Sequence, residues 1–237
     1  MGIPRSGTSL FVKMLNRISG IHCFNEIWYD VATLPGFFTS TRVDILNGNE
    51  VVNTFDESGD YTEDTLLEEN KHGEIVEGSE NLVLGLKVNE TFLFYLERLL
   101  YNTFLCFGLI RHPVYTIGSW NSEKAKGKLN VYDIETDDRY SGLNLKGSKF
   151  DRQAKLWDLY SSGFYRFKDY VPVFRYEDWT ANPAESLKEF ASEFGVVIPE
   201  IEPFETLNID DRYDNLDSIR KSVKKYCKSA KLWGYEI

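Results

Sequence analysis

Gly2-Ile3-Pro4-Arg5-Ser6-Gly7-Thr8-Ser9 carries two glycines separated by four residues, with two hydroxyl residues after the second glycine. In a P-loop this glycine spacing turns backbone N–H groups toward an anion at the N-terminus of a helix, where the helix dipole adds about half a positive charge. Leu10, Met14 and Leu15 follow at near-helical spacing, so we expect a helix over roughly residues 8–18. The stretch therefore predicts an anion-binding loop that leads into a helix, with a simple helix-capping turn as the alternative.

The residue after the second glycine separates this loop from that of nucleotide triphosphatases. Those enzymes place a lysine there, which reaches the β- and γ-phosphates. Here the position holds Thr8, and the only cation within the loop is Arg5. A magnesium-binding Asp would be expected after an apolar strand, but Arg111 follows the apolar run 103–110 instead. The loop therefore favours an anion that is held without a metal.

Apolar and amphipathic segments alternate along the chain, which indicates an α/β fold built on a parallel sheet. We expect one domain over residues 1–237, with the three-layer arrangement of P-loop proteins in which helices flank a central parallel sheet. Residues 27–80 and 123–150 do not follow the alternation, and we expect irregular insertions there, with one short helix near 63–69. The expected strands are 21–24, 81–88, 103–110 and 171–175, and the expected helices after 8–18 are 91–101, 114–122, 151–170, 182–194 and 216–233.

Composition excludes several classes of protein. The net charge of −10 comes from residues 50–80, which hold eleven acids and one base, while the rest of the chain has 26 of each. No basic face for nucleic acid is indicated. No apolar run reaches the roughly 18 residues of a membrane span, and no signal core follows the start. Three cysteines far apart predict no disulfide framework, which fits a reducing cytoplasm, and the three histidines lack metal-ligand spacing with them.

Arg111 offers a second anion contact. It ends an apolar run, and Ser119 lies eight residues later in the following expected helix. Ligands of open α/β sheets bind where strand ends and the next helices converge, and an arginine makes charge-assisted hydrogen bonds to phosphate oxygens. An arginine and a hydroxyl here therefore suit a second, separate phosphate, with a surface ion pair as the alternative reading of Arg111.

Four motifs together resemble the superfamily of sulfotransferases that use 3′-phosphoadenosine 5′-phosphosulfate (PAPS). Pro4–Ser9 looks like the family's 5′-phosphosulfate loop, and Arg111-His112-Pro113 with Ser119 looks like its 3′-phosphate motif. The segment Arg175–Pro183 and the ending Trp233-Gly234-Tyr235 are also similar to family segments. These motifs are most similar to those of the bacterial and tyrosylprotein branches of the family. The resemblance implies transfer of a sulfonate from PAPS to a hydroxyl or amine, with release of 3′-phosphoadenosine 5′-phosphate (PAP).

One feature departs from the family, which places a full β-strand before the loop. Only Gly2 and Ile3 precede Pro4 here, so we expect a shortened first strand or a truncated start.

The resemblance also implies roles for single residues. Arg5 would stabilise the leaving group, and Lys87, at the end of the 81–88 strand, would contact the sulfonate. The histidine base of the cytosolic branch is replaced by Asn89, which accepts no proton. Glu26 matches the glutamate base of the tyrosylprotein branch, and Glu90 is the local alternative.

The cofactor-binding set implied by the resemblance surrounds both phosphates. Tyr176 would lie near the adenine, with a role as a core aromatic residue as the alternative. We expect no metal, nucleic-acid or membrane partner, and the insertions 27–80 and 123–150 are expected to build the pocket of an unidentified acceptor. The remaining functional alternatives are a P-loop kinase or NTPase and a non-catalytic nucleotide-binding domain. The cofactor-binding residues that the resemblance implies are Arg5, Ser6, Gly7, Thr8, Ser9, Arg111, Ser119 and Tyr176.

Overall fold

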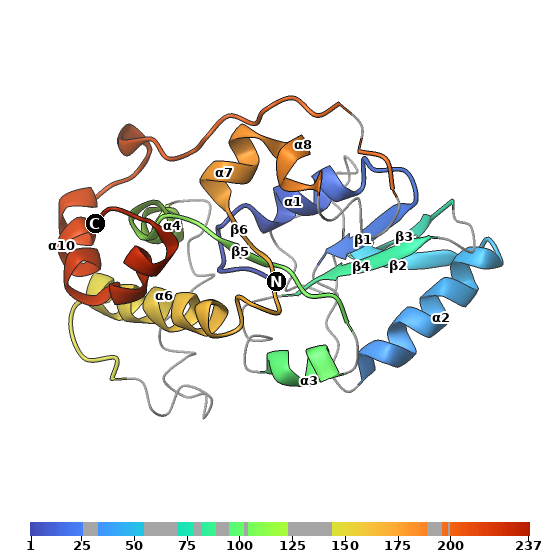
Figure 1. Ribbon diagram of the computed structural model, residues 1–237, viewed down its shortest axis with the longest axis horizontal. Coiled ribbons are helices and arrows are strands. Elements are labelled where there is room, and N and C mark those ends of the chain that lie inside the picture. The colour runs from blue at the N-terminus through green and yellow to red at the C-terminus, as the bar shows by residue number, and fades with distance from the viewer. Residues whose placement is uncertain are drawn as a thin grey trace.

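The computed structural model describes residues 1–25, 33–54, 71–77, 82–88, 95–101, 104–122, 144–188, 196–198 and 200–237. It has a mixed α/β fold in which helices surround short parallel strand pairs (Figure 1). In chain order the elements are α1 (Thr8–Leu15), β1 (Ile21–Asn25), α2 (Leu34–Leu46), β2 (Glu50–Thr54), β3 (Lys71–Ile75), β4 (Val83–Lys87), α3 (Leu96–Tyr101), β5 (Gly108–Ile110), α4 (Pro113–Trp120), α6 (Lys149–Arg166), β6 (Val173–Arg175), α7 (Tyr176–Ala181), α8 (Pro183–Ser186), the 3₁₀ turn η6 (Asp210–Arg212), α10 (Leu216–Tyr226) and the 3₁₀ helix η7 (Lys228–Trp233).

The parallel strands that the structure describes form two separate pairs rather than one central sheet. In the first pair β1 runs parallel to β4, with Asn25 opposite Lys87. In the second pair β5 runs parallel to β6. The first residues of the chain extend the second pair, because the Ile3 N–H donates to Leu109 O at 3.0 Å and the Leu109 N–H donates to Met1 O at 3.1 Å. The expected shortened first strand is therefore seen as a bridge beside β5, which places the loop that follows it at the sheet edge.

The longest described helix, α6, anchors the largest core. Its N-terminus is fixed by a capping box between Ser148 and Asp151, in which each side chain accepts from the other residue's backbone N–H. One face of α6 packs against α4 and α10 at one end of the molecule, while α2, β2 and β3 lie at the other end (Figure 1). The fully buried side chains of this core include Ile117, Trp157, Tyr160, Phe164 and Ile219.

The sequence prediction for residues 27–80 was wrong where the structure describes them. They include the thirteen-residue helix α2 and the antiparallel pair of β2 and β3. The helix escaped detection because Pro35-Gly36 has the look of a turn, although a proline is well tolerated in the first turn of a helix. Its buried stripe is also interrupted by the polar Thr41, between Phe37 and Ile45. The short helix expected near 63–69 lies outside the described residues.

Two further predictions differ in length. The expected strand 103–110 is paired only over Gly108–Ile110, and the chain at 104–107 borders a cavity rather than a neighbouring strand. The expected helix 216–233 breaks at Cys227, whose ψ of 69° lies outside the helical region, and continues as the 3₁₀ helix η7. Of the expected loop 123–150, residues 123–143 lie outside the described part. Among the helices that the structure describes, none is long and apolar enough to span a membrane.

The packing of β5 against α6 can be tested at Gly108. A Cβ at this position would lie 2.8 Å from Phe164 Cδ1 and 3.0 Å from Val173 Cγ2. Gly108→Ala should therefore lower the free energy of unfolding by about 1–3 kcal/mol through overpacking. In the control Gly36→Ala the added methyl group meets nothing within 4 Å, so stability should rise by about 0.4–1 kcal/mol. Urea unfolding measures both, and equal effects would contradict the packing described.

Candidate anion-binding site

The loop before α1 adopts a strained backbone. Both Arg5, with φ of 65°, and Gly7, with φ of 79°, lie in the left-handed region. Glycine is required at position 7 for a second reason, because a Cβ there would come within 2.7 Å of Tyr176 Cδ2. A non-glycine residue such as Arg5 in this region costs of order 1–3 kcal/mol, and such strain concentrates at functional sites.

The carbonyl groups of the loop accept hydrogen bonds from within the loop and from other parts of the chain. Ile3 O accepts from the Ser6 N–H at 3.1 Å, Pro4 O accepts from Trp120 Nε1 at 3.0 Å, and Arg5 O accepts from Arg111 Nη1 at 3.2 Å. No side chain caps the N-terminus of α1. The first N–H groups of a helix have no partner within the helix, so the loop presents an uncapped helix N-terminus, which attracts anions.

Arg5 joins the loop directly to α4. Its Nε donates to Ser119 Oγ at 3.0 Å, across 114 residues of sequence. Ser119 is 5% exposed, and its hydroxyl hydrogen has no acceptor among the residues that the structure describes. The structure therefore brings together two contacts that the sequence analysis had assigned to separate phosphates.

Arg111 is a buried cation held by neutral groups. It is 3% exposed, and its guanidinium stacks over the ring of Tyr176 at 4.7 Å. Besides Arg5 O, its donors reach Asn208 Oδ1 at 2.7 Å, Leu207 O at 2.9 Å and Tyr213 Oη at 3.0 Å. Within the described ranges it has no carboxylate partner. A buried charge without a counter-ion is costly, so this site gains stability from an added anion.

Glu177 fixes the surroundings of this arginine. Its Oε1 accepts from the His112 N–H at 3.0 Å and from Asn208 Nδ2 at 2.6 Å, and its Oε2 accepts from the Tyr235 hydroxyl at 3.0 Å. Burial, and then the Glu177 carboxylate, raise the pKa of Tyr235, which keeps this phenol protonated as a donor. The carboxylate therefore links the segment after Arg111, the Asn208 segment and the C-terminal Tyr235.

Tyr176 lies in the core. It is 2% exposed, its hydroxyl accepts from the Leu207 N–H at 3.2 Å, and its ring packs against Gly7 and Trp179. Burial raises the pKa of its phenol. In this arrangement the ring supports the loop and the Arg111 guanidinium, which corresponds to the core alternative for this residue.

Lys87 ends β4 and contacts the first turn of α1. This side chain is 8% exposed, and its Nζ donates to Ser9 Oγ at 3.1 Å, in the first turn of α1. Lys87, which is expected to contact the sulfonate, therefore lies at the same helix N-terminus as the loop.

Two buried polar side chains near this point have no hydrogen-bond partner among the residues that the structure describes. They are Ser6, within the loop, and Asn25, which is opposite Lys87 in the sheet register and fully buried. Sequence reasoning missed Asn25, since an asparagine at the end of an apolar run gives no signal on its own. Asn208 and Tyr213 were missed as well, because only the fold brings them to Arg111.

The candidate bases remain predictions. Glu26, Asn89 and Glu90 lie outside the described residues. Asn25 and Lys87, which are opposite each other, end β1 and β4, and Glu26 directly follows Asn25 in the chain.

Comparison with known proteins gives no further assignment. No model of a known protein family matches the chain, and no curated protein is significantly similar to it in sequence.

His112 makes the folding stability of the protein sensitive to pH. Its Nδ1 accepts from the Val114 N–H at 3.3 Å, which caps α4, and its Nε2 lies 3.1 Å from Glu236 O. Burial lowers its pKa below the ordinary value of 6.5, so the unfolded chain binds this proton more readily than the folded protein. The contribution of the neutral ring to stability is therefore present above pH 6.5 and is lost as the pH falls below that value.

We expect the urea midpoint of the wild type to fall between pH 7.5 and pH 5.5, and to fall less in His112→Asn, which keeps a capping acceptor. His22→Asn is the control, since it removes a histidine far from α4. The same pH dependence in the wild type and His112→Asn would exclude His112 as the titrating group.

Proposed function

We propose that this chain is a sulfotransferase that moves a sulfonate from PAPS to a hydroxyl or amine acceptor and releases PAP. The observation that supports this most strongly is the buried Arg111 guanidinium, which has only neutral partners in the described part of the chain and is joined through Arg5 to Ser119. Two cations and a hydroxyl beside one uncapped helix N-terminus fit a ligand with two separated anionic groups. The motif resemblance names PAPS as a ligand of that kind, on a P-loop three-layer fold.

The residues present fit the two ends of PAPS. For the 5′-phosphosulfate, the loop and the first turn of α1 offer backbone N–H groups and the hydroxyl of Ser6, which has no partner among the described residues. The end of β4 offers the ammonium of Lys87. For the 3′-phosphate, the charge of Arg111 and the hydroxyl hydrogen of Ser119 are at hand. The close packing of Gly7 against Tyr176 keeps the loop in the shape that exposes its N–H groups.

Each residue then has a role in an in-line displacement. The acceptor oxygen forms a bond to sulfur as the bond from sulfur to the phosphate oxygen breaks, and negative charge grows on that phosphate. Arg5 would stabilise the growing charge, and Lys87 would hold the sulfonate oxygens. Glu26 would take the proton of the acceptor, with Glu90 as the alternative base.

Two other functions make different predictions about ligands. A P-loop kinase or NTPase would prefer ATP with magnesium, although its loop lysine is replaced by Thr8. A non-catalytic nucleotide-binding domain would bind PAP without transferring a sulfonate. The kinase or NTPase alternative does not explain why a cation, Arg111, follows the apolar run where the magnesium-binding carboxylate is expected.

Calorimetric titration with PAP and with adenosine 5′-phosphate tests the 3′-phosphate contact. A hydrogen bond to a charged group contributes about 1.5–3 kcal/mol, so PAP should bind at least about tenfold more tightly. Ser119→Ala should lower the PAP affinity about tenfold and leave the affinity for adenosine 5′-phosphate unchanged.

Ser122→Ala is the matched control, because the Ser122 hydroxyl donates to Ser119 O and points back to its own helix end. Equal affinity for both nucleotides in the wild type would contradict the proposal. Tighter binding of ATP with magnesium than of PAP would favour the kinase reading.

A further inference from the structure

The side-chain amide of Asn25 is buried without a use in the fold. Asn25 is the last residue of β1 and is fully buried, and neither its amide nitrogen nor its amide oxygen has a hydrogen-bond partner in the described part of the chain. Its backbone N–H, in contrast, donates to Asn53 Oδ1 at 3.0 Å. A buried amide without hydrogen bonds lowers the stability of a protein. Such an orphaned group therefore suits a ligand better than it suits the fold.

The alternation of side chains along β1 sets the direction of this amide. Cys23, two residues before Asn25, belongs to the core that is formed with Phe11 of α1. Phe24, between them, packs instead against Phe37 of α2, with ring centroids 5.6 Å apart. Successive side chains of a strand point to opposite faces of the sheet, so Asn25 is on the face that α1 covers.

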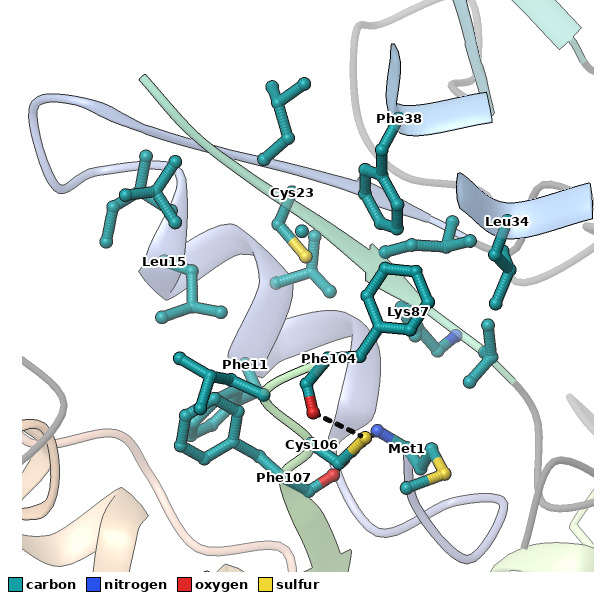
Figure 2. A pocket seen from close by; sticks show the side chains of 18 of the residues that line it. Met1, Phe11, Leu15, Cys23, Leu34, Phe38, Lys87, Phe104, Cys106 and Phe107 are labelled. Atoms are coloured by element: carbon teal, nitrogen blue, oxygen red, sulfur yellow. Dashed lines mark hydrogen bonds between the residues drawn. The ribbon is translucent and has the colours of Figure 1, made fainter. Parts of the chain in front are cut away.

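Lys87 is the neighbour of Asn25 on that face. The two residues are opposite each other in the parallel register of β1 and β4, and neighbouring strands lie roughly 5 Å apart. A Cβ at Gly85, two residues before Lys87, would lie 3.0 Å from Cys23 Sγ, which confirms that the odd positions of both strands share one face. Figure 2 shows Cys23 and Lys87 among the residues that line one cavity beside α1. Because Lys87 Nζ reaches Ser9 Oγ in the first turn of α1, Asn25 lies beside the side chain that leads to this helix N-terminus.

We propose that the side-chain amide of Asn25 donates a hydrogen bond to an oxygen of the transferred sulfonate, beside the Lys87 ammonium. This inference rests on the proposed function and adds a neutral donor to its two cations. The sulfonate of PAPS has three oxygens, each of which can accept from more than one donor. No bond is made or broken at Asn25, which instead helps to orient the sulfonate for in-line attack.

Thermal unfolding of Asn25→Leu tests whether the amide has a structural partner, because leucine has nearly the same volume and no polar group. Without nucleotide, Tm should rise by about 2 °C or more, since an orphaned amide is removed. Asn53→Leu is the matched control. Asn53 is also fully buried, but its Oδ1 accepts from the Asn25 N–H and its Nδ2 donates to Glu74 Oε1 at 2.5 Å, so Tm should fall.

Calorimetric titration with PAPS and with PAP tests the sulfonate contact, since the two nucleotides differ only by the sulfonate. In Asn25→Leu the affinity for PAPS should fall about tenfold or more, as expected for a lost hydrogen bond to a charged group. The affinity for PAP should stay at the wild-type value. Asn25→Asp should lower the affinity for PAPS further, because it places a carboxylate beside the sulfonate.

The possible failures of this inference and of the proposed function differ. If the wild type binds both nucleotides and Asn25→Leu keeps the same ratio of the two affinities, the role of Asn25 is overturned and the proposed function stands. A lower Tm in Asn25→Leu would also overturn this role, because the amide would then support the fold. A wild type that binds neither PAPS nor PAP would contradict the proposed function, and the sulfonate contact with it.

Discussion

The buried guanidinium of Arg111 connects the parts of the chain on which the site depends. It contacts the loop through Arg5 O, the segment before η6 through Leu207 and Asn208, and the ring of Tyr176. Taking a charge out of water costs several kcal/mol, which neutral acceptors offset only in part. A nearby anion would therefore stabilise the buried charge of Arg111. The uncapped N-terminus of α1 and the Ser119 hydroxyl are neighbouring groups suited to bind such an anion.

The helix α1 connects the surroundings of Arg111 with those of Lys87. Its first turn lies between Arg5, which reaches Ser119, and Lys87, which reaches Ser9. Gly7 allows the close approach of Tyr176 that keeps the loop and Arg111 in register. Because β4 positions Lys87 and β5 leads into Arg111, the relation between the two strand pairs decides how the two cations face one ligand.

Local patterns were sufficient for much of the fold and for part of the site. Apolar periodicity gave α1, α4 and α6 near their observed bounds, and the glycine spacing located the loop. The helix α2 was missed because its Pro35-Gly36 start and polar Thr41 hide its periodicity. Asn208 could not be predicted as a partner of Arg111, since 97 residues separate them and only the packing of α7 against the loop brings them together. The same limit applies to the bond between Arg5 and Ser119.

Hydrogen exchange with and without PAP tests whether the loop before α1 binds an anion, because it reports on the loop amides themselves. An anion at the N-terminus of α1 would accept from the N–H groups of residues 7–10, and Ser119 and Arg111 would hold the 3′-phosphate. We predict that saturating PAP slows exchange at residues 5–10 and 111–119, and that adenosine 5′-phosphate slows only the first of these segments. Unchanged exchange at residues 5–10, or protection confined to β4 and residues 104–107, would contradict this prediction.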